Sequence, residues 1–239
     1  MHINWNVIKS VLLLGLVVFL YAFSSHKNNS RMVSKVAVQF TGNENVYITS
    51  EMVNKLLIQN QEHLYILPKD NLDLKEMEMV LESDDMVKSA QVYLTVNGEV
   101  SATVEQRRPI ARVQTASIFY IDEDGLAMPL SPQHSARVPL VTGIIENEQL
   151  DAVYSMALKI DQDPFLKTYI TEIHQNKTKE IRLKMRLLNF EIEVGSLDRL
   201  DEKMKNLKAF YQKAKKDKML DIYKSVNLQF KNQVVCTKK

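Results

Sequence analysis

Cysteine and glycine are scarce in this chain of 239 residues. The single cysteine, Cys236, excludes an intramolecular disulfide framework and a zinc cluster built on cysteines. Only six glycines are present, and no glycine-rich phosphate loop is among them. A serine nucleophile elbow and an HExxH zinc motif are missing as well. We therefore expect no catalytic residues, no metal and no cofactor, and we interpret the chain as a non-enzyme.

A large excess of charge of one sign is also missing. The chain has 31 basic and 29 acidic residues, so charge gives no reason to expect nucleic acid. No motif points to a small-molecule substrate. The charge is nevertheless unevenly distributed. Residues 1–31 hold three basic residues and no acidic one, residues 32–106 hold 5 basic and 12 acidic residues, and residues 107–239 hold 23 and 17. The change of sign near residue 107 indicates a domain boundary.

Val11–Phe23 is the longest uncharged hydrophobic run. Its 13 residues are short for a membrane span, but extension toward the N-terminus gives 21 residues interrupted only by Lys9. A lysine near a helix end reaches the headgroups, and Trp5 and Tyr21 lie near the two ends, where interfacial aromatic residues are common. We expect an uncleaved anchor. The alternative is a signal peptide cleaved around Ala22-Phe23-Ser24.

Residues 33–107 show the pattern β-α-α-β-β. A strand is predicted over 36–40 and ends at Gly42-Asn43, and a first helix carries Val53, Leu56 and Leu57 on one face. Asp73 and Glu76 resemble a capping box that opens a second helix. Two alternating runs, 90–96 and 100–104, flank Asn97-Gly98 and predict a hairpin with a type I′ turn. The pattern is that of two helices on one face of a three-stranded sheet.

Residues beyond Pro109 predict a second domain with short strands and flanking helices. The predicted strands are Ala111–Gln114, Ile118–Ile121, Pro139–Val141, Ile170–His174, Glu180–Leu187, Phe190–Val194, the run from Val226 to Phe230, and Val234–Cys236. One helix is predicted over 148–161. Another starts at Ser196 or Asp198, with Leu200, Met204, Leu207 and Phe210 inward and its lysines outward. The acidic run at 122–125 lacks the spacing of a calcium loop and predicts a solvated turn.

Several motifs occur in an order that resembles the FtsQ/DivIB family of bitopic bacterial cell-division proteins. They are Val36-x-Val38-x-Phe40-x-Gly42-Asn43, Val87-x-x-Ala90-x-Val92, the run from Val104 to Ala111, Tyr120–Gly125, Pro139–Gly143, Val194-Gly195, and Val226–Phe230. The resemblance implies an α+β chain with one transmembrane helix, a β-α-α-β-β POTRA domain and a C-terminal mixed β-domain with flanking helices. The expected boundaries are 1–24 for the cytoplasmic tail and span, 25–34 for a stalk, 35–107 for the POTRA domain and 108–237 for the β-domain.

The same resemblance implies a non-catalytic scaffold of the septal division complex. It would sit in the inner membrane with its N-terminus cytoplasmic and its two domains periplasmic. The implied partners are FtsB/DivIC-like and FtsL-like coiled-coil membrane proteins, and further FtsK, FtsW and FtsI. Partner binding is expected by strand addition to an exposed terminal edge strand. The matching residues are Ser225, Val226, Asn227, Leu228, Gln229, Phe230, Lys231, Asn232 and, on the facing side, Lys179.

Two questions about contact residues and two alternative functions remain open. Phe230 is expected equally as a core residue and as a partner contact. The edge of the POTRA sheet is a second candidate surface. A POTRA-bearing component of a secretion or outer-membrane assembly system is the alternative function, because a fold alone does not define a function. A membrane-tethered hydrolase would require clustered acids, histidines or serines.

Overall fold

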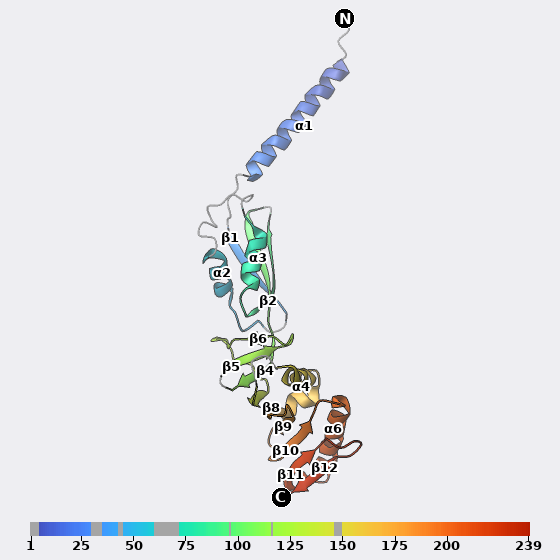
Figure 1. The fold of residues 1–239 in the computed structure, drawn as a ribbon. Coiled ribbons are helices and arrows are strands. Elements are labelled where there is room, and N and C mark those ends of the chain that lie inside the picture. The colour runs from blue at the N-terminus through green and yellow to red at the C-terminus, as the bar shows by residue number, and fades with distance from the viewer. Residues whose placement is uncertain are drawn as a thin grey trace. The chain divides into compact units, whose positions relative to one another are not determined.

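A computed structural model describes residues 5–29, 35–42, 45–59, 72–95, 97–115, 117–145 and 150–239. Asn43, Val96, the last stalk residues and the start of the predicted helix at 148 lie outside these ranges. The chain divides into two compact units, Met1–Gln106 and Arg107–Lys239. Each unit is described by itself (Figure 1).

The N-terminal helix, α1 (Trp5–Asn29), contains the expected apolar segment. Its stretch Ile8–His26 has a mean hydropathy of 2.0, and none of it is buried in the protein. A helix of this length and composition is sufficient to cross the hydrocarbon core of a bilayer.

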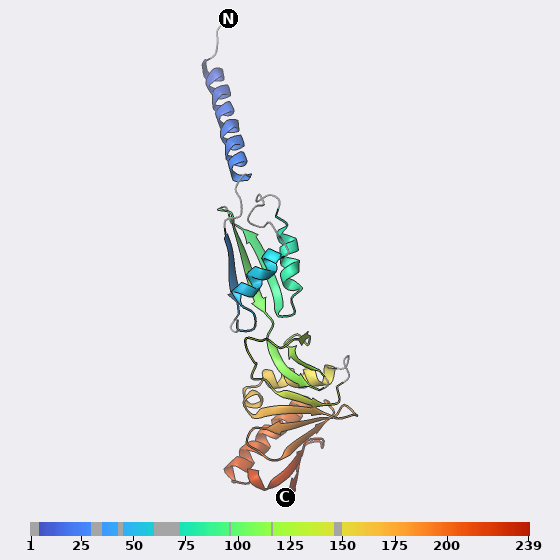
Figure 2. The same cartoon turned by 90° about the vertical axis from the view of Figure 1, so that its left-hand side faces the viewer.

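The first unit contains a three-stranded sheet with strand order β1-β3-β2. Its strands are β1 (Lys35–Thr41), β2 (Val87–Leu94) and β3 (Glu99–Gln106), with β1 parallel and β2 antiparallel to β3. The helices α2 (Ser50–Gln59) and α3 (Leu74–Glu82) pack beside the sheet (Figure 2). They bury Val53, Leu57, Met77 and Leu81. Asp73 caps α3 by accepting a hydrogen bond from the Glu76 amide, as the sequence predicts.

The hairpin between β2 and β3 differs from the predicted type I′ turn. The Gly98 amide donates to the Thr95 carbonyl, and the Thr95 amide donates to the Glu99 carbonyl. Three residues therefore separate Thr95 from Glu99. Of the described residues there, Gly98 has a positive φ, of 86°, and Asn97 does not, whereas a type I′ turn at Asn97-Gly98 needs a positive φ at both. The extra residue sets the strand register, and Leu94 pairs with Val100.

The second unit contains a nine-stranded sheet in the order β12-β11-β10-β9-β8-β7-β4-β5-β6. The strands are β4 (Pro109–Gln114), β5 (Ile118–Asp122), β6 (Ala127–Met128), β7 (Leu140–Gly143), β8 (Ile170–Gln175), β9 (Ile181–Met185), β10 (Glu191–Gly195), β11 (Tyr223–Asn227) and β12 (Val235–Lys238). The helices are α4 (Asp151–Asp161), α5 (Pro164–Tyr169), α6 (Leu200–Lys216) and the short 3-10 helix η2 (Leu220–Ile222). Helix α5 and strand β6 were not predicted.

Apolar residues from the sheet and the three α-helices form one core. Along β9, Ile181, Leu183 and Met185 are buried while Arg182 and Lys184 are exposed, as the alternation predicts. The helices contribute residues such as Met156, Leu166 and Leu207 to the same cluster. The predicted mixed α+β architecture with an N-terminal apolar helix is therefore confirmed.

The acidic run at 122–125 forms a turn, but it is not solvated throughout. Asp122 is only 1% exposed. One of its oxygens accepts from the amides of Asp124 and Leu126, and the other accepts from the Arg107 guanidinium at 2.9 Å. The buried carboxylate thus closes the turn between β5 and β6, because it supplies acceptors that the local backbone cannot.

Candidate partner-binding edge

The C-terminal edge strand of the large sheet is β12 and not the predicted segment 225–230, and the opposite edge is the two-residue strand β6. Strand β11 is parallel to β10 on one side and antiparallel to β12 on the other. The prediction placed the edge one strand too early, because the last four-residue strand folds back onto β11. Beyond β12, no further strand of the described residues lies in the sheet.

The direction of the β12 backbone groups follows from the hydrogen bonds around β11. The Leu228 amide donates to the Glu193 carbonyl on β10 at 2.9 Å, and the Lys239 amide donates to the Ile222 carbonyl at 2.9 Å. Because amides alternate in direction along a strand, Val235, Thr237 and Lys239 face β11. Cys236 and Lys238 therefore present their N–H and C=O groups outward, where an added strand would pair.

The β12 side chains leave this edge accessible. Val235 is 43% exposed, and Thr237 and Lys238 are exposed. The Cys236 side chain is half-buried against the core, and burial raises the pKa of its thiol. The outward edge therefore carries no reactive thiolate, and its recognition chemistry is that of the backbone together with Val235 and the loop before it.

The predicted site residues on the β11 side divide into three groups. The side chains of Val226 and Leu228 belong to the core, at 0% and 2% exposed, and cannot be contacted by a partner. Ser225 and Asn227 are half-buried. Exposed residues make up the loop that leads to β12, namely Gln229, Phe230, Lys231 and Asn232.

Strand β11 ends at Asn227, three residues before the predicted end. The Asn227 side-chain oxygen accepts a hydrogen bond from the Gln229 amide at 2.9 Å, and this local bond turns the backbone out of the ladder. Phe230 consequently leaves the alternating pattern and is 47% exposed. Of the two roles expected for Phe230, the structure contradicts the core role.

The first turn of α6 supports this loop. Arg199 donates to the Gln229 carbonyl at 3.3 Å, and Glu202 accepts from the Asn232 amide at 3.4 Å. Gly195, with a φ of 70°, packs directly against Gln229, and an added Cβ would lie 2.8 Å from the Gln229 Cγ. The loop is thus held by both the end of β10 and the start of α6.

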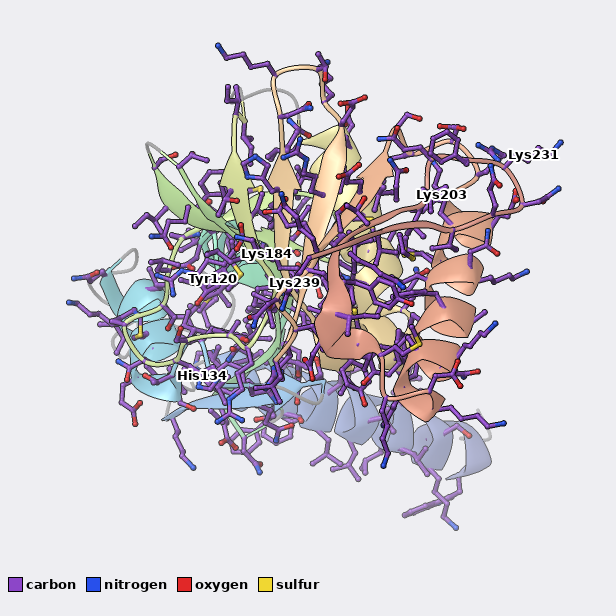
Figure 3. The ribbon with its side chains drawn as sticks, turned by 90° about the horizontal axis from the view of Figure 1, so that it is seen from below. Tyr120, His134, Lys184, Lys203, Lys231 and Lys239 are labelled. Atoms are coloured by element: carbon purple, nitrogen blue, oxygen red, sulfur yellow. The ribbon has the colours of Figure 1, made fainter. Side chains whose placement is uncertain are left out.

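Lys203 is a buried structural contact at the start of α6 that the sequence prediction missed. It was predicted to face outward, but it is 3% exposed, and its ammonium donates to the Ser196 carbonyl at 2.7 Å. Figure 3 shows Lys203 and Lys231 at the same end of α6. Lys203 precedes Leu207 by four residues, so the helical spacing puts it on the buried face of α6. The prediction of an outward side chain came from its charge alone. Helix α6 also begins at Leu200, later than predicted, after Arg199 in a left-handed conformation.

Lys179 lies in the turn between β8 and β9, at the same end of the sheet as Gln229. Ile181 pairs with Gly195, which packs against Gln229, so Lys179 and Gln229 flank the end of β10. Lys179 is exposed and has a φ of 62°. The structure brings this residue and the exposed loop to one end of the sheet.

The first unit has two sheet edges of its own, and one of them is closed. The amides of Ala90 and Val92 on β2 donate to the carboxylates of Glu82 and Glu78, at 3.2 and 2.8 Å. Both glutamates come from α3. The other edge, β1, pairs only with β3 within the described part of the chain. Among the described residues, β1 is therefore the edge of this sheet at which a partner strand could pair.

The architecture is that of a membrane-anchored chain with a small α+β unit followed by a mixed sheet that has an open final edge. The model of a POTRA-like domain matches residues 32–105, and the model described as FtsQ/DivIB, C-terminal related, matches residues 108–237. The second match covers more than half of the chain, so the chain belongs to the FtsQ/DivIB C-terminal related family. A comparison with curated proteins found no match. The family supports a role in cell division, as part of a non-catalytic scaffold, and α1 supports a single-pass membrane anchor.

Proposed function

We propose that this protein is a divisome scaffold that binds FtsB/DivIC-like and FtsL-like partners by strand addition at β12. Family membership supports cell division over a secretion or outer-membrane assembly role, because residues 108–237 match the FtsQ/DivIB C-terminal related domain in addition to the POTRA-like match of the first unit. The remaining proposed partners, FtsK, FtsW and FtsI, rest on the same membership.

The outward backbone groups of Cys236 and Lys238 are the observation that carries the proposal. An added strand along β12 would gain main-chain hydrogen bonds, and side chains would supply specificity. Phe230 and Lys231 lie in the loop that joins β11 to β12. This loop and Lys179 lie at the end of the sheet where β12 begins. The predicted contact set is therefore revised to the β12 backbone, the loop 229–232 and Lys179.

For the membrane topology, we propose a cytoplasmic N-terminus, two domains on the far side of the inner membrane, and accumulation at the septum. The apolar helix α1 supports insertion. The proposed orientation rests on the family membership. A fluorescent fusion tests localisation, because a division protein gathers at the septum and a general assembly component surrounds the cell.

Lys238→Pro tests the edge directly. Proline lacks the amide hydrogen, and at this position the amide points away from β11, so the fold should tolerate the change. The full chain is co-purified with a candidate coiled-coil partner, with Lys238→Ala as the matched control that keeps the donor. We expect at least about tenfold weaker binding for the proline variant, which corresponds to about 1.4 kcal/mol. Equal binding by both variants would exclude strand addition at β12.

A further inference from the structure

A cavity of about 280 Å³ opens in the second unit, where β4 and β8 begin and β9 ends. Its floor is apolar and includes Ile110, Ile160 and Ile170, each at most 3% exposed. Its rim carries the exposed cations Arg137 and Arg186 and the hydroxyl of Thr171. The cavity therefore combines a hydrophobic base with positive charge at the opening.

The one carboxylate in the lining is already neutralised. Asp161 accepts two hydrogen bonds from the Arg108 guanidinium, at 2.9 and 2.7 Å, and one from Lys167 at 2.7 Å. The Arg108 hydrogen bonds, opposed by burial and assisted by Lys167, hold the pKa of Asp161 below its usual range. Lys167 is thereby paired as well.

Arg137 and Arg186 differ from the other cations of this lining. Within the described part of the chain, no carboxylate forms an ion pair with either side chain. An arginine fork matches the two oxygens of a carboxylate, and a bidentate pair beside an apolar surface is stronger than an exposed point contact. Two such forks at one opening favour a ligand with negative charge.

We propose that this cavity binds an acidic segment of a partner polypeptide, with a carboxylate side chain on Arg137 and Arg186 and an adjacent apolar side chain on the isoleucine floor. The volume lies just below the range of small-molecule pockets and suits one or two side chains. The second unit also carries 23 basic against 17 acidic residues, which attracts acidic segments.

This site is separate from the proposed edge at β12. Arg186 follows β9 and Lys179 precedes it, so the cavity and the β11–β12 loop lie toward opposite ends of that strand. In the strand order, β12 is three strands away from β9. Binding at the cavity and binding at the edge can therefore fail independently of each other.

The test uses the full chain in detergent micelles and a fluorescein-labelled peptide, Gly-Glu-Leu-Glu-Gly, followed by fluorescence anisotropy at fixed salt. Arg137→Gln with Arg186→Gln should weaken binding at least about tenfold. Lys213→Gln with Lys216→Gln removes the same charge from exposed positions of α6 and should change binding less than about twofold, as expected for screened surface charge. Thr171→Trp fills the cavity without changing charge and should also weaken binding.

Three results would overturn the proposal. They are an equal loss in the α6 control, equal binding of the peptide Gly-Gln-Leu-Gln-Gly, and displacement of the acidic peptide by inorganic phosphate at comparable concentration. The last result would mean a simple anion site without peptide recognition. Thermal unfolding of each variant checks that the second unit remains folded, and Lys238→Pro should leave this binding unchanged.

Discussion

The edge strands β12 of the large sheet and β2 of the small sheet meet solvent in different ways. Strand β12 presents the backbone of Cys236 and Lys238 outward, whereas the outward amides of β2, at Ala90 and Val92, are bound by Glu82 and Glu78. Both strands are edges, but only β12 keeps outward amides that an added strand could bind, because those of Ala90 and Val92 on β2 already donate to glutamates. Position at the edge of a sheet therefore does not by itself define a docking surface, because a neighbouring helix can occupy the edge first.

Helix and strand geometry explains how α3 closes β2. Residues four apart on a helix rise by about 6.0 Å, and residues two apart on a strand by about 6.6 Å. Glu78 and Glu82 are therefore spaced to reach alternate amides of the strand that follows them. Helix α6 offers no such carboxylates to β12, and it supports the loop before β12 instead, through Arg199 and Glu202.

The largest expected loss of stability comes from a proline placed where the chain pairs with the interior strand β10, in contrast to a proline at the edge strand β12. Leu228→Pro removes the amide bonded to Glu193 and also a core side chain, and we expect a loss of about 3 to 5 kcal/mol in the free energy of unfolding. Leu228→Ala removes only the side chain and should cost less. Denaturant unfolding of the full chain measures both, and a proline variant no less stable than the alanine variant would contradict the pairing with β10.

Lys203 tests the support of the open edge. Lys203→Ala should cost about 2 kcal/mol, because the Ser196 carbonyl loses a charged donor, Asp198 loses its ion pair with the ammonium, and the buried lysine stem leaves a space. Lys203→Met keeps the stem and should recover part of the loss. Urea unfolding gives these values. If both variants match the unaltered chain, the buried ammonium does not hold this region.

Removal of the carboxylates should convert the closed edge into an open one. Glu78→Ala and Glu82→Ala should each cost about 1 kcal/mol and should speed hydrogen exchange at the Val92 and Ala90 amides respectively. The Gln variants keep an acceptor oxygen and should protect those amides better. Unchanged exchange in the Ala variants would show that the carboxylates do not close β2.

The smallest effect concerns pH in the second unit. The pKa of Asp161 is lowered, mainly by its hydrogen bonds to Arg108, so its stabilising contribution is present above the ordinary carboxyl pKa of 3.8 and is lost as pH falls through the lower folded value. Asp161→Asn should therefore be less stable than the unaltered chain at neutral pH, with a difference that shrinks below about pH 4. A difference that is constant with pH would mean that the charge of Asp161 does not matter.

Local pattern predicted most of the elements. Alternation at 36–40 and along β9 gave the strands, and Asp73 with Glu76 marked the start of α3, because these signals depend on neighbours in the chain. The hairpin at Asn97-Gly98 was found, but its turn type was wrong, since one additional loop residue changes the register without changing the apolar pattern.

The candidate site was harder to predict. The sequence singled out Gln229 to Asn232 and Lys179, and the structure exposes these residues at one end of the sheet. It assigned the edge to 225–230, because four residues at the C-terminus are too short to show whether they pair. The sequence prediction also extended β11 to Phe230, because the apolar alternation continues past Asn227. In the structure the Asn227 side chain ends the strand by accepting a hydrogen bond from the Gln229 amide.

The sequence by itself determined the apolar helix, the acidic first unit, the basic second unit and the α+β class, because composition and periodicity are properties of short stretches of chain. Only the tertiary structure decided which strands are edges, which edge Glu78 and Glu82 close, and why Lys203 is buried. These features arise when segments distant in sequence pair their backbone groups, and the free energy of a buried amide or ammonium depends on the partner that the fold brings to it.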